Sequence, residues 1–314
     1  MPGAGSRIAA VAGARPDRIV RNAELAASLG VSAEWIERRT GIRERRFAGP
    51  EESVPKMAAN AAGKALSAAG LTPADVDLVV LATCSMPSSM PGGAASVAAL
   101  LGIGGTAAFD VNAACAGFCY GLGIADGLVR AGTSRCALVV GAERMTDWVD
   151  PADVNTAPIF ADGAGAAVVV PAPETGIHPV VWGGDGNRAS LITIPDRHGH
   201  VMMQGQPVYR WATTELVAVA EEACARSGRR PADLKGLVTH QANLRLLELL
   251  ASRLGAVNAA VARDVVEAGN TSAASVPLAL SRLVAQGDLQ PGDPVLLLGF
   301  GAGLSYAGQV IHCP

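Results

Sequence analysis

Three side chains of this 314-residue chain have the types needed for nucleophilic catalysis through a covalent intermediate. Cys115 follows the apolar run 107–111 and the tripeptide Asn-Ala-Ala, at the expected start of a helix. Unpaired backbone N–H groups and the positive end of the helix dipole favour a thiolate at such a place. Cys115 is therefore a candidate nucleophile, and a buried apolar cysteine is the alternative. Cys119, one turn later, lacks this terminus and is expected only to pack.

His240 and Asn270 are the candidate partners of this thiol. His240 follows the apolar run 237–239, at the carboxyl end of an expected strand, where α/β sheets place catalytic groups. Asn270 follows Val265 and Val266, which we interpret as another strand end, and it opens a further helix. The alternatives are a structural histidine and an asparagine that only caps a helix. Together, a thiol, an imidazole and an amide at equivalent strand ends indicate nucleophilic catalysis.

An internal repeat relates the segments that hold these residues. Residues 73–83 resemble residues 231–239, which lie 158 positions further on. The same offset carries Asn112 onto Asn270 and the run 138–141 onto 296–299. Three ordered matches in one register favour a duplication over a chance likeness of connectors and apolar strands. Asn270 is then expected opposite the loop that bears Cys115.

The elements expected around this site alternate between apolar strands and alanine-rich helices. Continuous apolar runs such as 78–82 are typical of strands in sheets covered on both faces. We therefore expect an α/β fold with two duplicated halves, 1–170 and 171–314, in five layers of helix and sheet. Residues 171–205, rich in Gly, Pro and Asp, are interpreted as the connection and a binding loop. The predicted helices, each followed by a glycine, are 53–69, 115–131, 209–227 and 244–254.

Composition excludes several classes of protein. Half of the residues are hydrophobic and the formal net charge is −3, which argues against disorder and against nucleic-acid binding. No apolar run is long enough for a membrane span, and residues 8–14 are too short for a signal peptide, so we expect a cytoplasmic protein. The six cysteines show no paired spacing and are expected as free thiols. His198 and His200 are too few for a metal site.

The sequence resembles the β-ketoacyl-acyl-carrier-protein synthase III family of the thiolase superfamily over nearly its whole length. The resemblance implies a thiolase-like αβαβα sandwich and a two-step decarboxylative Claisen condensation. Cys115 would take the acyl group from acyl-CoA, and a malonyl group on acyl carrier protein would then lose CO2 and attack it. A homodimer without metal or cofactor is implied. The matching segments are 34–46, 109–118, 162–167, 240–245, 269–275 and 299–303.

The resemblance also implies roles for individual residues. His240 and Asn270 would stabilise the enolate, and the backbone N–H groups of Cys115 and Ala302 would form the oxyanion hole. The remaining residues are implied by groups: Trp35, Arg39, Met203, Gly205 and Asn243 for CoA and pantetheine, Met90 and Phe300 for the acyl pocket, and Arg245 and Arg210 for docking an acidic carrier protein.

Two positions bear on the substrates. Val154 stands where the family pattern has an arginine beside the adenine. CoA binding is therefore expected to be weaker or differently arranged, and an acyl donor carried by a carrier protein stays an alternative. Met90 aligns with the residue that crosses the dimer interface to floor the partner's acyl pocket. A flexible thioether leaves adaptable room, which predicts a starter that is longer or branched rather than only acetyl.

Two other functions stay open at this point. A thiolase-fold acyltransferase would acylate Cys115 and pass the group to a hydroxyl, an amine or a carrier thiol without decarboxylation. Asn270 favours condensation, because simple transfer needs no second enolate donor. A non-catalytic partner subunit is disfavoured because all three chemical residues are present. The Arg-rich, Lys-poor composition is consistent with a GC-rich bacterium, and the pathway, fatty acid or aromatic polyketide, is left undecided.

Overall fold

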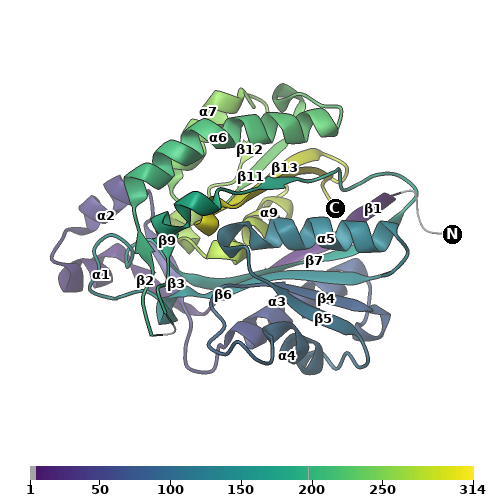
Figure 1. The fold of residues 1–314 in the computed structure, drawn as a ribbon, viewed down its shortest axis with the longest axis horizontal. Coiled ribbons are helices and arrows are strands. Elements are labelled where there is room, and N and C mark those ends of the chain that lie inside the picture. Colours follow the sequence, from purple (N-terminus) through teal and green to yellow (C-terminus); the bar gives the residue numbers. More distant parts are fainter. Residues whose placement is uncertain (1–4, 197) are drawn as a thin grey trace.

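A computed structural model describes residues 5–196 and 198–314, which form two five-stranded sheets with helices between and outside them (Figure 1). In the first sheet the strand order is β1-β7-β6-β4-β5. Strands β4, β5 and β6 run parallel, while β7 and β1 pair antiparallel at one side. The strands span Gly5–Ala14 (β1), Leu78–Ala82 (β4), Ala107–Val111 (β5), Ala137–Arg144 (β6) and Asp162–Ala172 (β7).

The second sheet repeats this topology with the order β12-β11-β13-β14-β8. Strands β11, β12 and β13 are parallel, and β14 and β8 are antiparallel. We call the parts of the chain that form the two sheets the N-terminal half and the C-terminal half. The strands of this sheet span Val181–Gly183 (β8), Gly236–Thr239 (β11), Ala260–Val261 (β12), Pro294–Phe300 (β13) and Tyr306–His312 (β14).

Three layers of helices enclose and separate the sheets, which gives the five-layer sandwich that the sequence predicts (Figure 1). Helices α3 and α4 cover the outer face of the first sheet, α5 and α9 lie between the sheets, and α6 and α7 cover the second. The helices span Val54–Ala69 (α3), Gly93–Leu100 (α4), Gly117–Arg130 (α5), Gly205–Arg226 (α6), Leu244–Leu254 (α7) and Ser275–Gln286 (α9).

Small residues allow these layers to approach closely. On α3, the side chains of Ala58, Ala61, Ala62 and Ala65 are fully buried at helical spacing against the first sheet. All five residues of β4 are buried, as expected of a central strand with helices on both faces. Cys119 is also buried in the core between the sheets. The apolar layers therefore provide a rigid frame for the loops at the strand ends.

The register of the two sheets follows the offset seen in the sequence. Leu78 pairs with Ala137 in the first sheet, and Gly236 pairs with Val295, each 158 positions later, in the second. Short 3-10 turns recur at the same offset, at 73–75 and 231–233 and again at 114–116 and 272–274. The division at 170 stays a prediction, and β7 runs two residues beyond it, to Ala172.

Several boundaries differ from the predicted ones. Val265 and Val266 lie in a short helix, α8 (Val265–Ala268), and the interpretation as a strand end is wrong. Residues 171–205 contain β8, an edge strand that the sequence analysis did not predict. Helix α6 begins at Gly205 rather than at 209. The remaining elements are α1 (Asn22–Leu29), α2 (Ala33–Thr40), β2 (Arg18–Arg21), β3 (Glu44–Phe47), β9 (Ile192–Thr193) and β10 (Met202–Met203).

The described residues include no helix that is long and apolar enough to cross a membrane.

Candidate active site

A cavity of about 710 Å³ lies where the ends of the strands of both halves meet. Cys115, His240 and Asn270 all line it, so the structure brings the three predicted chemical residues to one site. Phe300 also contributes to its wall. Of the residues predicted for binding, the wall further includes Arg39, Met203, Gly205, Arg210, Asn243 and Arg245.

Cys115 is presented by a sharp turn between β5 and α5. The backbone passes through Ala114 with a positive φ of 45° and a 3-10 turn before α5 begins at Gly117. The glycine-rich turn after β13 lies directly against it. A Cβ added to Gly301 would lie 2.8 Å from Cβ and 3.1 Å from Sγ of Cys115, so only glycine fits there. Gly301 lines the cavity, whereas the predicted oxyanion-hole residue Ala302 does not.

The protonation state of Cys115 differs from the predicted one. Burial raises the pKa of Cys115 to about 12; a hydrogen bond from Ser272 lowers it and the charge of Glu143 raises it further. The sequence analysis expected the helix terminus to favour the thiolate. Desolvation outweighs that effect because the cysteine lies inside the protein, where a charged sulfur is poorly solvated. At neutral pH the resting residue is therefore a thiol.

His240 directly follows β11 and is held on several sides. The backbone N–H of His240 donates to the Leu298 carbonyl at 2.7 Å, and the ring atom Nδ1 lies 2.8 Å from Oγ of Ser275. The Phe300 ring meets the imidazole edge-on, with centroids 5.1 Å apart. Burial lowers the pKa of His240 to about 3, so the ring is neutral near pH 7. Nδ1 faces Ser275, and a hydrogen bond between the imidazole and the Ser272 backbone partly offsets the effect of burial on the pKa of His240.

Asn270 is anchored to the N-terminal half through its backbone. Its N–H donates to the Ile159 carbonyl and its own carbonyl accepts the N–H of Ala161, both at 2.9 Å. Its side-chain Oδ1 accepts the N–H of Ser272 at 2.9 Å. Because the oxygen is occupied, the amide nitrogen is the end of Asn270 left to donate into the cavity.

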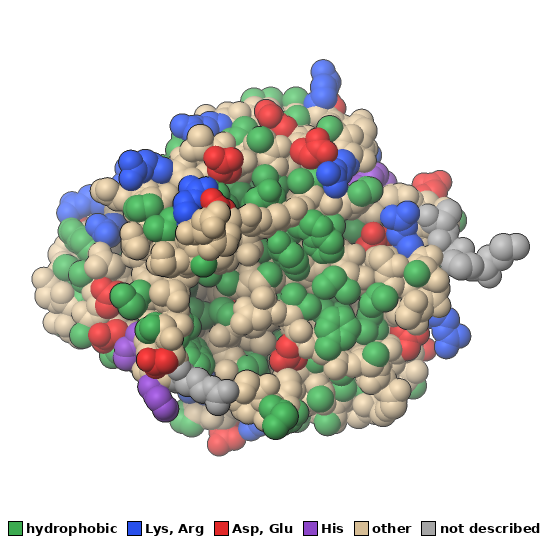
Figure 2. Space-filling model, in the orientation of Figure 1, with side chains coloured by type: hydrophobic (Ala, Val, Ile, Leu, Met, Phe, Trp, Pro, Cys, Tyr) green, Lys and Arg blue, Asp and Glu red, His purple; other side chains and the backbone are tan. Residues whose placement is uncertain are grey.

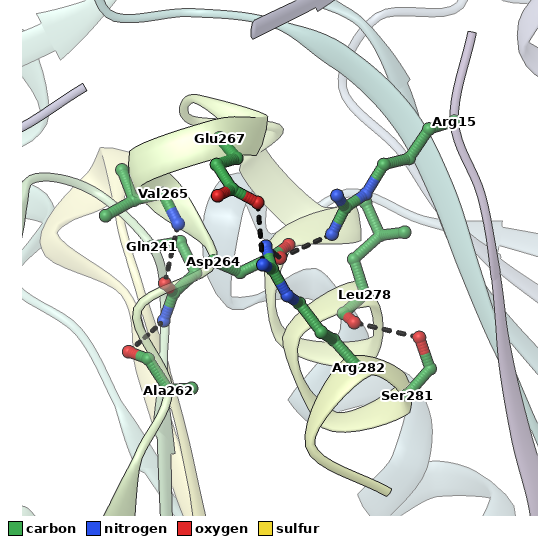
Figure 3. A network of polar contacts seen from close by, with 9 residues as sticks. All are labelled: Arg15, Gln241, Ala262, Asp264, Val265, Glu267, Leu278, Ser281 and Arg282. Carbon is green, nitrogen blue, oxygen red and sulfur yellow. Dashed lines mark hydrogen bonds and ion pairs between the residues drawn. The ribbon is translucent and has the colours of Figure 1, made fainter. Parts of the chain in front are cut away.

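A polar network fixes the segments that lead to His240 and Asn270 (Figure 3). The Gln241 amide donates to the carbonyls of Thr239 at 2.8 Å and Ala262 at 3.3 Å, and its oxygen accepts the N–H of Val265 at 3.0 Å. Gln241 thereby joins the end of β11 to the start of α8. The N–H of Val265 is used in this bond rather than in a sheet, which explains why the residues before Asn270 form a helix.

Ionic contacts hold α8 from its other side (Figure 3). Asp264, which is buried, pairs with Arg15 at the end of β1 and with Arg282 on α9 at 3.1 Å. Arg282 also pairs with Glu267 at 2.6 Å. Sequence reasoning missed Gln241 and Asp264 as site-supporting residues. The only local signal was the position of Gln241 directly after His240.

The cavity mouth contains a stacked cation. The Arg39 guanidinium lies over the Trp35 ring, 5.1 Å from its centroid, and donates to the Asn155 side chain at 3.2 Å. The Asn243 amide donates to the Arg39 carbonyl at 3.1 Å, which links α2 to the start of α7. Val154 is half-buried beside Asn155. Arg39 thus provides a positive charge at the cavity wall, next to Trp35 and Asn155.

Three of the predicted residues are absent from the part of the cavity wall that the described residues form: Trp35, Met90 and Ala302. Trp35 touches the mouth only through Arg39. Met90 is 85 % exposed on the loop before α4. Its predicted role in an acyl pocket therefore concerns the pocket of a second copy, not that of its own chain.

The fold and site define a class of protein: a thiolase-like acyltransferase, in which two similar layered halves enclose a cysteine at the start of a central helix. Residues 109–186 match the family model for 3-oxoacyl-[acyl-carrier-protein] synthase III, and residues 224–313 match its C-terminal model. The chain is 56 % identical to β-ketoacyl-[acyl-carrier-protein] synthase III 4 of Streptomyces coelicolor, over 99 % of both proteins. It is 54 % identical to synthase III 2 of Streptomyces avermitilis, again over 99 % of both.

Solved structures of ketosynthases superpose closely on this chain. The priming β-ketosynthase of the R1128 polyketide biosynthetic pathway superposes with a TM-score of 0.95 at 43 % identity, covering 100 % of this chain and 98 % of that one. The 3-oxoacyl-[acyl-carrier-protein] synthase III of Aquifex aeolicus gives 0.94 at 34 % identity, covering 98 % and 100 %. The chain belongs to the β-ketoacyl-acyl-carrier-protein synthase III family. It is an acyltransferase of the ketosynthase III type, which condenses acyl units to initiate fatty-acid or polyketide chains.

Proposed function

We propose that this enzyme forms an acyl-enzyme on Cys115 from acyl-CoA and condenses it with malonyl-acyl carrier protein, using His240 and Asn270 as enolate donors. The observation that supports this proposal best is the free amide nitrogen of Asn270 in the same cavity as a neutral imidazole and a thiol. Two neutral donors suit the negative charge that decarboxylation places on the thioester oxygen.

In the first step, Sγ of Cys115 attacks the thioester carbon of acyl-CoA. Because the thiol is neutral at rest, its proton must leave as the bond forms, and the neutral His240 accepts it. The imidazolium then gives this proton to the departing CoA sulfur. The backbone N–H of Cys115 and that of the adjacent turn, at Gly301 or the predicted Ala302, would stabilise the developing oxyanion. This step returns His240 to its neutral form.

In the second step, the malonyl thioester loses CO2, and the resulting carbanion attacks the acyl carbon on Cys115. The bond between this carbon and Sγ breaks, and the expelled thiolate takes up a proton from solvent. Nε2 of His240 and Nδ2 of Asn270 donate hydrogen bonds to the enolate oxygen. Donation from Nε2 requires Nδ1 to accept a hydrogen bond from its neighbour. The Ser275 hydroxyl can donate or accept, so it can pair with either neutral tautomer, and the change of tautomer between the steps takes place by proton exchange with solvent. Side chains and backbone groups suffice for both steps, and we propose that no metal or cofactor takes part.

A second copy of the chain completes the proposed enzyme. The outer side of β5 has no partner strand among the described residues. The loop that bears Met90 is tied to this strand, since Asp110 accepts the N–H groups of Gly93 and Ala94, both at 2.7 Å. Hydrophobic side chains gather on the face that α5 presents (Figure 2), and Phe109 and Trp182 are exposed. An open strand edge beside apolar side chains favours a homodimer that extends the sheet.

Several finer points are also proposals. Arg210 and Arg245 line the cavity mouth and would meet the acidic carrier protein. Arg39, Met203, Gly205 and Asn243 would contact pantetheine and CoA, with Trp35 behind Arg39. Phe300 would contribute to the acyl pocket. The cytoplasmic location that the sequence indicates stays a prediction.

Intact-mass measurements test the proposed reaction. Wild type and Asn270→Ala are each mixed with acyl-CoA and then with malonyl-acyl carrier protein, and CO2 and β-ketoacyl product are followed. The proposal expects acylation of both proteins and product only from the wild type. Acylation of the wild type without CO2 release would instead favour acyl transfer to a hydroxyl, an amine or a carrier thiol.

A further inference from the structure

Glu143 is a completely buried carboxylate near the end of β6 that the proposed steps leave unused. Donors of the N-terminal half surround it. The hydroxyls of Thr83 and Ser85 and the thiol of Cys84 donate to it, the first at 3.1 Å and the last at 3.2 Å, and the Cys84 N–H donates at 3.1 Å. Burial raises the pKa of Glu143, and the hydrogen bonds from Ser85, Cys84 and Ser272 lower it. A site lined by donors favours the ionised carboxylate, which accepts hydrogen bonds and donates none.

Two further donors come from the C-terminal half, in the turn that follows Asn270. The Ser272 hydroxyl donates to Glu143 at 3.0 Å and the Ala273 N–H at 3.4 Å. Ser272 has a φ of 48°, in the left-handed region that residues other than glycine avoid. Its N–H is the group that occupies Oδ1 of Asn270. Glu143 therefore holds the strained residue that turns the Asn270 amide nitrogen toward the cavity.

The β6 backbone is shaped for this contact. A Cβ added to Gly141, two residues before Glu143, would collide with the backbone of Ala273. The strand and the turn after Asn270 thus lie in direct contact across the two halves.

The same carboxylate also acts on Cys115. Burial is the main reason that the pKa of Cys115 is raised; the hydrogen bond from Ser272 lowers the pKa, and the charge of Glu143 raises it. The other titratable groups near the sulfur are Cys84, whose own pKa is raised by burial, and the neutral His240 across the cavity. Loss of the Glu143 charge would therefore increase the thiolate fraction of Cys115.

We propose that Glu143 is a positioning residue that orients the amide nitrogen of Asn270 for decarboxylation. The inference rests on the proposed function and adds to it a residue that serves the second step through the turn after Asn270. The proposal predicts two opposite effects. Removing the charge of Glu143 should slow condensation and should make Cys115 of the unacylated enzyme more reactive, a combination that general destabilisation does not produce.

Glu143→Gln tests the proposal, because the amide keeps the shape but turns one acceptor into a donor that faces other donors. Relative to wild type, decarboxylation by the acyl-enzyme should fall on the order of 10- to 100-fold, as small displacements of catalytic groups do. Acylation of Cys115 by acyl-CoA should be retained. Iodoacetamide should alkylate Cys115 of the free enzyme several-fold faster at pH 8, with a pH profile moved to lower pH.

Asp126→Asn is the matched control. Asp126 is a buried carboxylate further along α5. It accepts a hydrogen bond from the Ser6 hydroxyl at 2.7 Å and has no hydrogen bond to the Asn270 turn. This variant should lower the melting temperature without changing the ratio of decarboxylation to acylation or the alkylation profile. Ser272→Ala is a second test, since it removes the hydroxyl bond to Glu143 but keeps the charge of Glu143. It should slow decarboxylation like Glu143→Gln and retain acylation of Cys115.

Slower decarboxylation with retained acylation in Glu143→Gln and Ser272→Ala, together with faster alkylation of Glu143→Gln, supports the proposal. An unchanged ratio of decarboxylation to acylation in either variant, or alkylation of Glu143→Gln that is no faster than that of wild type, overturns it. If Glu143→Gln does not fold, the ratio measured for Ser272→Ala decides alone. Wild-type CO2 release tests the proposed function separately, so a failure of that function is distinguishable from a failure of this inference.

Discussion

Asn112 and Asn270 make the same hydrogen bond in the same turn of the two halves. Oδ1 of Asn112 accepts the N–H of Ala114 at 3.3 Å, and Oδ1 of Asn270 accepts the N–H of Ser272 at 2.9 Å. Ala114 and Ser272 both have positive φ angles, 45° and 48°. One turn presents a cysteine and the other presents an amide nitrogen. A single local conformation therefore supplies both the nucleophile and the enolate donor.

The orientation of Asn270 predicts the effect of an isosteric change. Asn270→Asp replaces the donating nitrogen with a charged oxygen that repels the enolate. Condensation should fall on the order of 100- to 1,000-fold, the usual effect of losing one oxyanion donor. Acylation of Cys115 should persist, as measured by intact mass. Asn112→Asp, in the equivalent turn, is the control and should leave decarboxylation by the acyl-enzyme far less affected.

The raised pKa of Cys115, about 12, and the lowered pKa of His240, about 3, predict the pH dependence of the free enzyme. Both groups are neutral between pH 6 and 9, and only the thiolate reacts with iodoacetamide. The alkylation rate should therefore rise about tenfold per pH unit over this range. Peptide mapping of Cys115 gives the rate, with Cys115→Ser as background. A plateau starting near pH 6 would indicate a thiolate–imidazolium pair and contradict the assignment.

Gln241 should stabilise the site without touching substrate. Gln241→Met keeps the length of the side chain and removes its bonds to Thr239, Ala262 and Val265. Leaving these buried backbone groups unpaired should cost about 1–3 kcal/mol of unfolding free energy, measured in urea. Gln290→Met, at an exposed turn, should cost much less. Equal unfolding free energies of the two variants would show that the Gln241 hydrogen bonds do not stabilise the protein.

Met90 should affect the starter preference of the enzyme through the partner subunit. The wild type should accept isobutyryl- and hexanoyl-CoA, and Met90→Phe should shift the preference toward acetyl-CoA because a rigid ring fills the pocket. Initial rates with the three donors measure this. Val257→Phe alters a similarly exposed side chain after α7 and should change nothing. A strong acetyl preference of the wild type would contradict the prediction.

Arg245 should contribute to recognition of the carrier protein. Arg245→Glu should raise KM for malonyl-acyl carrier protein about tenfold, with an effect that weakens at high salt. Its effect on acylation by acyl-CoA should be small. Lys64→Glu, on the outer helix α3, makes the same charge change away from the cavity. Similar kinetics of the two variants would remove Arg245 from the docking surface.

Local patterns predicted most elements of the fold. The strand Leu78–Ala82 and the helix Leu244–Leu254 have the bounds that the sequence indicated, because apolar runs and terminal glycines act over short distances. The offset of 158 residues also recurs in the strand register. These features required no knowledge of contacts between distant segments.

Long-range contacts explain what the sequence did not predict. Val265 and Val266 have the composition of a strand, but Gln241 and the arginines around Asp264 hold them in a helix. The helix terminus at Cys115 is visible in the sequence, whereas the burial that overrides it is not. Glu143 gave no signal, because its donors come from two segments far from it in the chain, 83–85 and 272–273.

The backbone bonds of Asn270 to Ile159 and Ala161 limit how the molecule can move. They cross the boundary between the two halves, so a hinge motion that separated the halves would pull the amide away from the cavity. We therefore expect the proposed substrates and products to enter and leave while the halves stay closed. Side-chain movements at the cavity wall beside Arg39, rather than domain opening, are then expected to limit entry and release.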